Sequence, residues 1–444
     1  MGRLTRWLLA AALACAVGVI AADAAAAFDG FGTLEADSTY GQNITFDVSL
    51  DGGAPDELEL LLRTPGSDAA FVVPVDASGT RASYVWNTAV DYVTPNTLVT
   101  YQWRAFDGDE VTVSDEATIR YDDDRPGLDW QSRQLGEATV HWYGDAEAQA
   151  VRFGELTALG VERGEERLGT TLAGPVDVFV YASRDAFFGA LGPGAREWTG
   201  AAAFSEIRTI FMWNSAEAGS QAYLETAMVH EVTHIVFHDA TDNPFHEPAR
   251  WLNEGIATWS EAGDAGGDRA IVENEASGGG LFAFDAITEQ FPIGERGGRL
   301  SYAQGTTMVD LIVDTYGPEA LARITAAYRD GASDAEALEA GTGIPADELY
   351  ADYYSSFGVE APTPIAPGAI APSNVDRPTA GEVDPGGVDP DAERPPDEGS
   401  PSEGGAPSGG GFDVGLVVLL AAASVAAGLA AVAVSRRAER RARS

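Results

Sequence analysis

An apolar stretch near the C-terminus constrains the organisation of this chain more than any other feature. Residues 414–434 are 21 consecutive residues in which Ser424 is the only polar side chain. At about 1.5 Å of rise per residue, a helix of this length spans the roughly 30 Å hydrocarbon core of a bilayer. Residues 435–444 then hold five Arg and one Glu. Because positive charge stays on the cytoplasmic side, we expect one transmembrane helix over 412–435 and a basic cytoplasmic tail over 436–444.

The N-terminus has the pattern of a secretory signal peptide. Arg3 and Arg6 precede an apolar run over 7–22, and small residues follow at 24–27. A basic start, a short apolar core and a small-residue end are typical of such a peptide. We therefore predict that residues 1–27 are removed and that the chain is a single-pass protein of the cell membrane, with its bulk outside and its C-terminus inside. An uncleaved anchor and a lipoprotein acylated at Cys15 are the alternatives.

The charge of the chain excludes some partners. There are 69 Asp and Glu against 27 Lys and Arg, which gives a formal net charge of −42. This charge repels a phosphate backbone and an anionic membrane surface, so we expect no nucleic-acid partner. It also destabilises a compact state at low ionic strength, whereas roughly 1 M salt shortens the Debye length to about 3 Å. The composition therefore predicts a halophilic setting, with a merely soluble acidic surface as the alternative.

Two segments of the expected ectodomain carry no cluster of catalytic side chains. Residues 361–411 contain 11 of the 23 Pro, 10 Gly and no aromatic residue, which predicts a disordered, acidic stalk. Residues 28–124 are rich in short alternating runs, such as 44–50, 98–104 and 110–120, separated by Gly-containing turns. This spacing predicts an all-β sandwich of the Ig- or fibronectin-like kind, which serves as a spacer or binds a partner that the sequence does not identify.

Residues 125–360 mix strand and helix patterns and predict an α+β domain. We expect strands at 138–142, 176–181 and 207–213. We expect helices at 146–169, 221–239, 251–261, 302–316 and 319–329.

The chemistry of this domain is concentrated in one predicted helix. His230-Glu231-Val232-Thr233-His234 places two imidazoles at i and i+4, one turn apart on one helix face. Two such nitrogens can bind one Zn²⁺ at roughly 2.0–2.1 Å. Glu231 projects to one side of the pair, where it faces the water of the site as a general base without binding the metal.

A catalytic zinc needs a third protein ligand and one open position. The candidate is Glu254, which follows His234 after a loop and the start of another predicted helix. His238, one turn further along the first helix, and His246, in the loop, are the alternatives. The sequence therefore predicts a zinc site made by His230, His234 and Glu254.

At this point the sequence resembles the gluzincins, the metallopeptidase clan that includes thermolysin and aminopeptidase N. The likeness rests on residues 230–234 and on Trp-Leu-Asn-Glu-Gly-Ile-Ala at 251–257. It is closest to the peptidase MA-like metallohydrolases and extends over about residues 136–354, including the segments 174–176 and 198–200. The resemblance implies a gluzincin-like domain over 125–360 with the same three zinc ligands and with Glu231 as the catalytic base.

The resemblance also implies roles for two further residues. Tyr302, in Tyr-Ala-Gln-Gly, lies where aminopeptidase-type members place a tyrosine that stabilises the transition state. A packing role at a helix start is the alternative for Tyr302. Glu261 matches an acidic position of the family, and a carboxylate that accepts the far N–H of a ligand histidine fixes its tautomer. We therefore expect Tyr302 to be catalytic and Glu261 to support a ligand.

The expected function is hydrolysis of peptide bonds in a peptide or protein substrate, through a zinc-activated water with Glu231 as general base. The Gly-x-Met-Glu-Asn element that holds a free α-amine in aminopeptidases is absent from the sequence. Residues 200–213 offer an equivalent substrate-binding edge strand, with Glu206 as its only acid. We therefore expect an endopeptidase-like enzyme. The alternative is an adhesion or binding ectodomain with an inactive or structural zinc domain.

Overall fold

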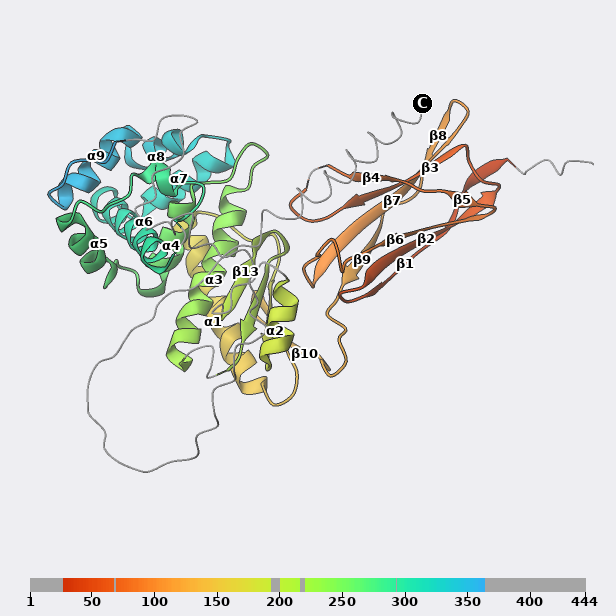
Figure 1. The fold of residues 1–444 in the computed structure, drawn as a ribbon, viewed down its shortest axis with the longest axis horizontal. Coiled ribbons are helices and arrows are strands. Elements are labelled where there is room, and N and C mark those ends of the chain that lie inside the picture. The colour runs from red at the N-terminus through yellow and green to blue at the C-terminus, as the bar shows by residue number, and fades with distance from the viewer. Residues whose placement is uncertain (1–26, 68, 193–199, 216–219, 293, 364–444) are drawn as a thin grey trace, which may run out of the picture.

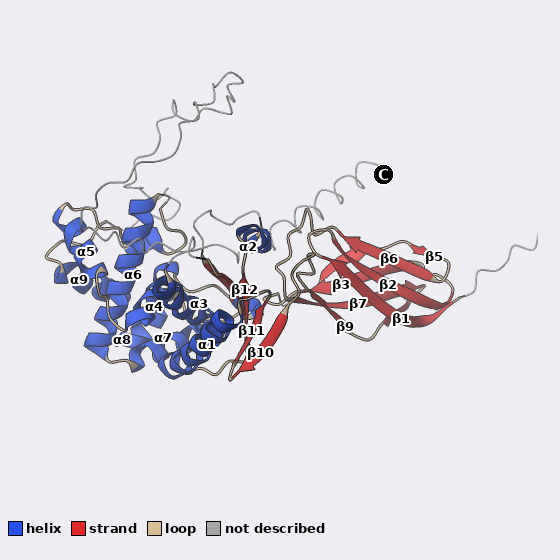
Figure 2. Cartoon of the chain, turned by 90° about the horizontal axis from the view of Figure 1, so that it is seen from below, coloured by secondary structure: helices blue, strands red, loops and turns tan. Residues whose placement is uncertain are grey.

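The computed structural model describes residues 27–67, 69–192, 200–215, 220–292 and 294–363 (Figure 1). The predicted signal peptide, transmembrane helix and tail, and nearly all of the stalk, lie outside these residues. Within the described residues, no helix is both long and apolar enough to cross a membrane. A β-sandwich lies at one end of the molecule and a helical region at the other, with a mixed sheet between them (Figures 1 and 2).

The N-terminal part is a sandwich of two antiparallel sheets. One sheet has the order β1 (Phe28–Thr39), β2 (Asn43–Gly52), β6 (Arg81–Trp86), β5 (Ala77–Ser78). The other has the order β4 (Phe71–Pro74), β3 (Glu57–Arg63), β7 (Thr97–Asp107), β8 (Glu110–Val113), with β9 (Ala117–Tyr121) also paired to β7. Alternate side chains of β2 and β7 face one shared core, where the rings of Phe46 and Tyr101 are 5.0 Å apart. The predicted β-sandwich is confirmed, whereas its kinship to Ig or fibronectin domains stays a prediction.

One strand of the sandwich was predicted wrongly. The sequence pattern favours a single strand over 110–120, but the structure divides it into β8 and β9. Ser114 lies at the break, where its N–H donates to the carbonyl of Trp103 and its hydroxyl oxygen accepts the Trp103 N–H. A side-chain hydrogen bond therefore replaces one rung of the backbone ladder, which produces a bulge that alternation alone does not reveal.

The central sheet of the second domain has the order β10 (Gln131–Leu135), β11 (Ala138–Trp142), β12 (Val176–Tyr181), β14 (Thr209–Trp213), β13 (Ala201–Phe204). β11, β12 and β14 are parallel, while β10 and β13 are antiparallel edge strands. The helix α1 (Glu147–Leu168) connects β11 to β12, and α2 (Arg184–Leu191) follows β12. The predicted strand over 207–213 begins late because a 3-10 turn, η1 (Ser205–Ile207), and Arg208 at φ 45° precede β14.

The remaining elements are helical. The order is α3 (Gln221–Thr241), α4 (Arg250–Ala262), α5 (Asp268–Ser277), η2 (Phe284–Ile287), α6 (Glu295–Tyr316), α7 (Glu319–Arg329), α8 (Asp334–Thr342), α9 (Ala346–Ser356). α3 packs against α1, α4 and the edge strand β13, so it lies inside the domain. The five predicted helices are present. However, α6 begins seven residues before the expected start at Tyr302, and α2, α5, α8 and α9 were not predicted.

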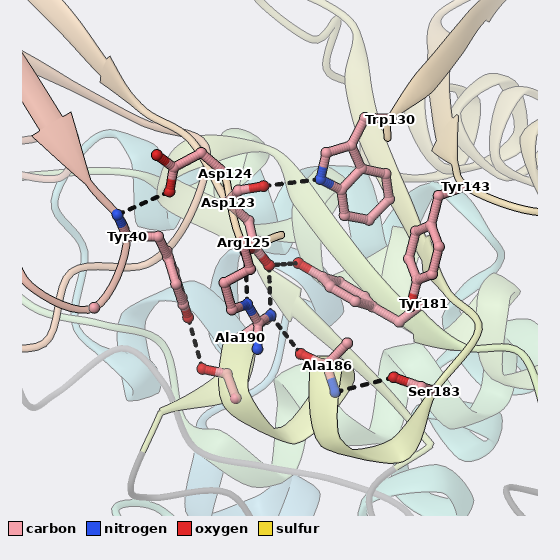
Figure 3. A network of polar contacts seen from close by, with 12 residues as sticks. Tyr40, Asp123, Asp124, Arg125, Trp130, Tyr143, Tyr181, Ser183, Ala186 and Ala190 are labelled. Carbon is pink, nitrogen blue, oxygen red and sulfur yellow. Dashed lines mark hydrogen bonds and ion pairs between the residues drawn. The ribbon is translucent and has the colours of Figure 1, made fainter. Parts of the chain in front are cut away.

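The sandwich is joined to the second domain by a partly buried polar network (Figure 3). The carboxylate of Asp123 accepts hydrogen bonds from Arg125 at 2.5 and 2.7 Å and from the Tyr181 hydroxyl at 3.0 Å. Arg125 also donates to the carbonyl of Ala186 in α2 at 2.6 Å. Tyr40, directly after β1, donates to the carbonyl of Gly189 in the same helix at 2.6 Å. These contacts fix the sandwich against α2 and β12.

Candidate metal centre

Both imidazoles of the motif lie on one face of α3. The hydroxyl of Ser220 caps this helix by accepting the N–H of Tyr223, and the helix runs without a break through the motif. The rings of His230 and His234 are 4.8 Å apart, and both side chains are buried. The predicted i, i+4 pairing is therefore present in a part of the domain that is shielded from water.

Glu254 of α4 completes a group of three. Its Oε2 lies 3.6 Å from Nε2 of His230 and 3.5 Å from Nε2 of His234. Across all three residues, one ligand atom from each lies within 4.8 Å of the others. Two atoms that are each about 2.1 Å from an ion in a tetrahedral arrangement lie roughly 3.4 Å apart. The three side chains therefore have the spacing that a zinc ion needs.

The outer nitrogens of the two histidines are held by other side chains. Nδ1 of His230 lies 2.8 Å from Oε1 of Glu261, and Nδ1 of His234 lies 2.8 Å from Oδ1 of Asn253. With Nδ1–H donating to these oxygens, each Nε2 keeps its lone pair for a metal. Glu261 is thus placed where the resemblance implied. Asn253 was missed, although it directly precedes Glu254 in the motif, because the sequence does not show which way its side chain points.

The inner atoms of the group lack protein partners. Among the described residues, Nε2 of His230, Nε2 of His234 and Oε2 of Glu254 are buried without a hydrogen bond. Buried acceptors without a donor are destabilising, and three that face one another require a cation or another donor between them. Imidazole nitrogen and carboxylate oxygen are ordinary zinc ligands. The residues present therefore fit a zinc ion, and neither His238 nor His246 belongs to the group.

The electrostatics of the group also favour a bound cation. Burial lowers the pKa of His230, but the nearby carboxylates of Glu254 and Glu261 outweigh this and raise it to about 10. Burial lowers the pKa of His234 to about 4. The carboxylates thus stabilise one positive charge among the imidazoles, and a metal ion supplies that charge without a proton.

Glu231 points toward the edge strand β13 rather than into the group of three. Its Oε2 accepts the backbone N–H of Ala203 at 2.8 Å, whereas its Oε1 is buried without a hydrogen-bond partner. Burial raises the pKa of Glu231 to about 7. A carboxyl with this pKa takes up and releases a proton near neutral pH, as a general acid–base group requires.

Tyr302 of α6 lies beside the group. Its ring centroid is 6.4 Å from that of His230 and 5.2 Å from that of Phe291. Burial, followed by the negative charge of Glu254, raises the pKa of the Tyr302 hydroxyl well above its ordinary value. Tyr302 therefore lies next to the ligands as a protonated phenol, and it also packs against a neighbouring aromatic ring.

A close contact between α4 and α6 brings Tyr302 and Glu254 together. A Cβ added to Gly305 would lie 2.4 Å from the carbonyl oxygen of Trp251, and one added to Gly255 would lie 2.5 Å from the carbonyl carbon of Gly305. The two backbones touch at this point, so neither glycine can carry a side chain unless a helix moves. The glycines that follow Tyr302 and Glu254 in their motifs thus have a packing role.

We expect Gly305→Ala to destabilise the fold by about 1–3 kcal/mol, because the added methyl group overpacks the contact between α4 and α6. The matched control is Gly298→Ala in the same helix, where an added Cβ meets nothing within 4 Å. That change should be neutral or stabilise by up to ~1 kcal/mol, because alanine is the better helix former. Urea unfolding of both variants measures the difference, and equal stabilities would contradict the proposed contact.

A comparison with known protein families gave one match in the part of the chain that contains this group. The family model described as Peptidase MA superfamily matches residues 158–357, a segment that includes the group of three. The predicted resemblance to peptidase MA-like metallohydrolases is therefore confirmed for that segment. A search of curated proteins gave no match.

Two solved structures show only distant similarity. Native yeast LTA4 hydrolase has a TM-score of 0.36 and 12% identity, over 73% of this chain and 66% of that one. This chain thus spans just under two thirds of the length of that hydrolase. A Br derivative of BhCBM56 has a TM-score of 0.17 and 7% identity, over 20% of this chain and 98% of that one.

Proposed function

We propose that this chain is a zinc metallopeptidase that cleaves within polypeptides. The observation that carries the proposal is the convergence of three buried acceptor atoms without protein partners, from His230, His234 and Glu254. The match of this segment to the Peptidase MA superfamily supports it. The four residues to which we assign roles in metal binding and proton transfer are all present, which favours an active enzyme over an inactive relic.

Each side chain has one part in the proposed mechanism. A zinc ion held by His230, His234 and Glu254 would supply a Lewis acid and a water of lowered pKa. Glu231 takes the proton of the attacking water on Oε1, because Ala203 holds Oε2, and then delivers it to the leaving amine. The Tyr302 phenol donates a hydrogen bond to the developing oxyanion, a contribution that is typically worth about 2.7–4 kcal/mol.

The edge strand β13 offers a place for an extended substrate. Among the residues that the structure describes, β13 is the outermost strand of its sheet and pairs only with β14. An extended peptide can add to such an edge through main-chain hydrogen bonds, which do not depend on a free terminus. Because Ala203 of this strand also holds Glu231, a peptide laid along β13 passes next to the proposed base.

Metal analysis together with peptide-library cleavage tests the proposed function. We expect cleavage at internal bonds, loss of cleavage after chelation and recovery when zinc is added back. Purified chain that carries zinc yet cleaves no peptide, in low or molar salt, would favour a binding ectodomain instead.

We also propose that the enzyme acts at the outer surface of the cell. The signal-peptide pattern over 1–27 and the apolar segment over 414–434 support this location, with one membrane-spanning helix as the anchor. Protease added to intact cells should remove the ectodomain and leave a small fragment that contains the tail. Recovery of the whole chain from the soluble cytoplasmic fraction would refute this location.

The acidic surface predicts salt-dependent stability. The full chain has a formal net charge of −42, and such an acidic excess gives self-repulsion in the folded ectodomain, which about 1 M KCl screens. We therefore expect the urea midpoint of the ectodomain to rise between 0.05 M and about 1 M KCl, beyond the effect on a protein of near-zero net charge. A midpoint that does not change with salt would remove the halophilic interpretation.

A further inference from the structure

A cavity of about 500 Å³ lies between the sandwich and the helical region. One wall comes from the sandwich, with residues 63–67 at the end of β3 and in the loop after it, and with Leu98 and Thr100 of β7. The other wall comes from Asp242, Asn243 and Pro244, directly after α3. This volume falls within the roughly 300–1,000 Å³ that is usual for ligand pockets. Nothing in the proposed mechanism uses this cavity.

The walls of the cavity are held in place. The side-chain amide of Asn243 donates to the carbonyls of Thr241 and His246, and its oxygen accepts the N–H groups of Phe245 and His246. On the sandwich side, Gly66 has a φ of 77° and packs so closely on Glu206 that an added Cβ would lie 2.8 Å from Cγ of Glu206. The cavity is therefore preformed by contacts within each wall and between the domains.

The cavity lies along the line that leads away from the proposed catalytic base. This line begins where the backbone N–H of Ala203 in β13 donates to Glu231 of α3. Further along, Glu206 of η1 packs against Gly66, which lines the cavity together with Asp242. The path from β13 through η1 thus follows α3 toward its C-terminal end, where the cavity opens.

The distance along this line suits a polypeptide. From Glu231 to Asp242, α3 advances by about 16 Å at 1.5 Å per residue. An extended chain covers this distance in about five residues. The walls offer hydroxyl groups from Thr64, Ser67 and Thr100 beside the partly exposed apolar side chain of Leu98. Such a mixture of hydrogen-bonding and apolar groups fits an extended peptide segment.

We propose that this cavity is a second binding site for the substrate polypeptide, occupied by the segment about five residues from the scissile bond on one side. The sandwich then takes part in substrate binding, because it forms one wall of the site. The partly buried network of Asp123 and Arg125 holds the sandwich in the position that this role requires. This inference rests on the proposed peptidase function.

Substrates of different length test the inference. The probes are synthetic peptides built on the best-cleaved library sequence: a short core, and the same core extended by six residues on either side. For the full ectodomain, we expect extension on one side alone to raise kcat/KM about tenfold, which corresponds to ~1.4 kcal/mol of binding. The gain should appear mainly as a lower KM.

Tryptophan substitutions locate the effect in the cavity. Thr64→Trp, or independently Ser67→Trp, should fill the cavity and remove the gain from extension, while cleavage of the short core stays unchanged and shows that the variant is folded. The matched control is Val85→Trp, at a position that is 54% exposed in the other sheet of the sandwich, and it should keep the full gain. An equal gain in the filled variants, or no gain in the native chain, would overturn the second site. If the native chain cleaves neither peptide, the proposed function and this inference both fail.

Discussion

Glu231→Gln is expected to reduce peptide hydrolysis by a factor of about 10²–10⁴ and to leave the zinc content unchanged. The amide keeps the shape of the side chain and an oxygen that accepts the N–H of Ala203, so the local structure survives. It cannot take a proton from water, so the acid–base step is lost. The loss should therefore appear in kcat for every substrate, with KM little changed.

A second carboxylate on the same helix provides the control. Glu225 lies on α3 and pairs with Arg152 at 2.8 Å, away from the metal group. Glu225→Gln removes one negative charge from the same helix and should keep the activity of the native chain. Full activity in Glu231→Gln, or equal losses in the two variants, would show that Glu231 is not the base.

Glu254→Ala is expected to abolish stoichiometric zinc binding. This change removes one of three ligands and also the negative charge that favours a cation between the two imidazoles. Glu261→Gln should have a graded effect, because it weakens the support of His230 but removes no ligand; outer-shell changes typically cost about 10–100-fold in metal affinity. Competition with a chromophoric chelator measures both affinities.

The loss of zinc affinity should be larger in Glu254→Ala than in Glu261→Gln, and this ranking distinguishes a ligand from a residue that supports one. Glu348→Ala, at an exposed position of α9, removes a carboxylate far along the chain and should bind zinc as the native chain does. Circular dichroism of each variant shows whether the fold is kept. Native zinc affinity in a folded Glu254→Ala variant would exclude Glu254 as a ligand, and a larger loss in Glu261→Gln than in Glu254→Ala would reverse the assigned roles.

The sequence predicted the metal group better than its surroundings for a physical reason. The i, i+4 spacing of His230 and His234 is a local property of a helix, so the motif alone fixes their relation. Glu254 could be predicted because a loop and a second helix, α4, bring the chain back beside the two histidines. Asn253 and Ala203 touch the site only through the packing of α3 against α4 and β13, which no local pattern encodes.

The helices and strands could be predicted where the apolar pattern is regular. Their limits could not be predicted where a side-chain hydrogen bond or tertiary packing decides them. The limits of β11 and α7 match the expected ranges, because their apolar patterns are uninterrupted. The break at Ser114 and the early start of α6 depend on a side-chain hydrogen bond and on tertiary packing, respectively. The contacts between the sandwich and the second domain were also not predicted. Asp123 binds Tyr181, which is 58 residues away in the sequence, and Arg125 binds Ala186, which is 61 residues away.

Metal analysis of the purified ectodomain, beside the Glu254→Ala variant, tests the central claim most directly. After dialysis against zinc-free buffer in molar salt, the native chain should retain close to one zinc ion per molecule and the variant close to none. X-ray absorption at the zinc edge should then show nitrogen and oxygen ligands only, with two imidazoles among them. Zinc content in the native chain no higher than in the variant would contradict the proposed metal centre, and with it the proposed hydrolase.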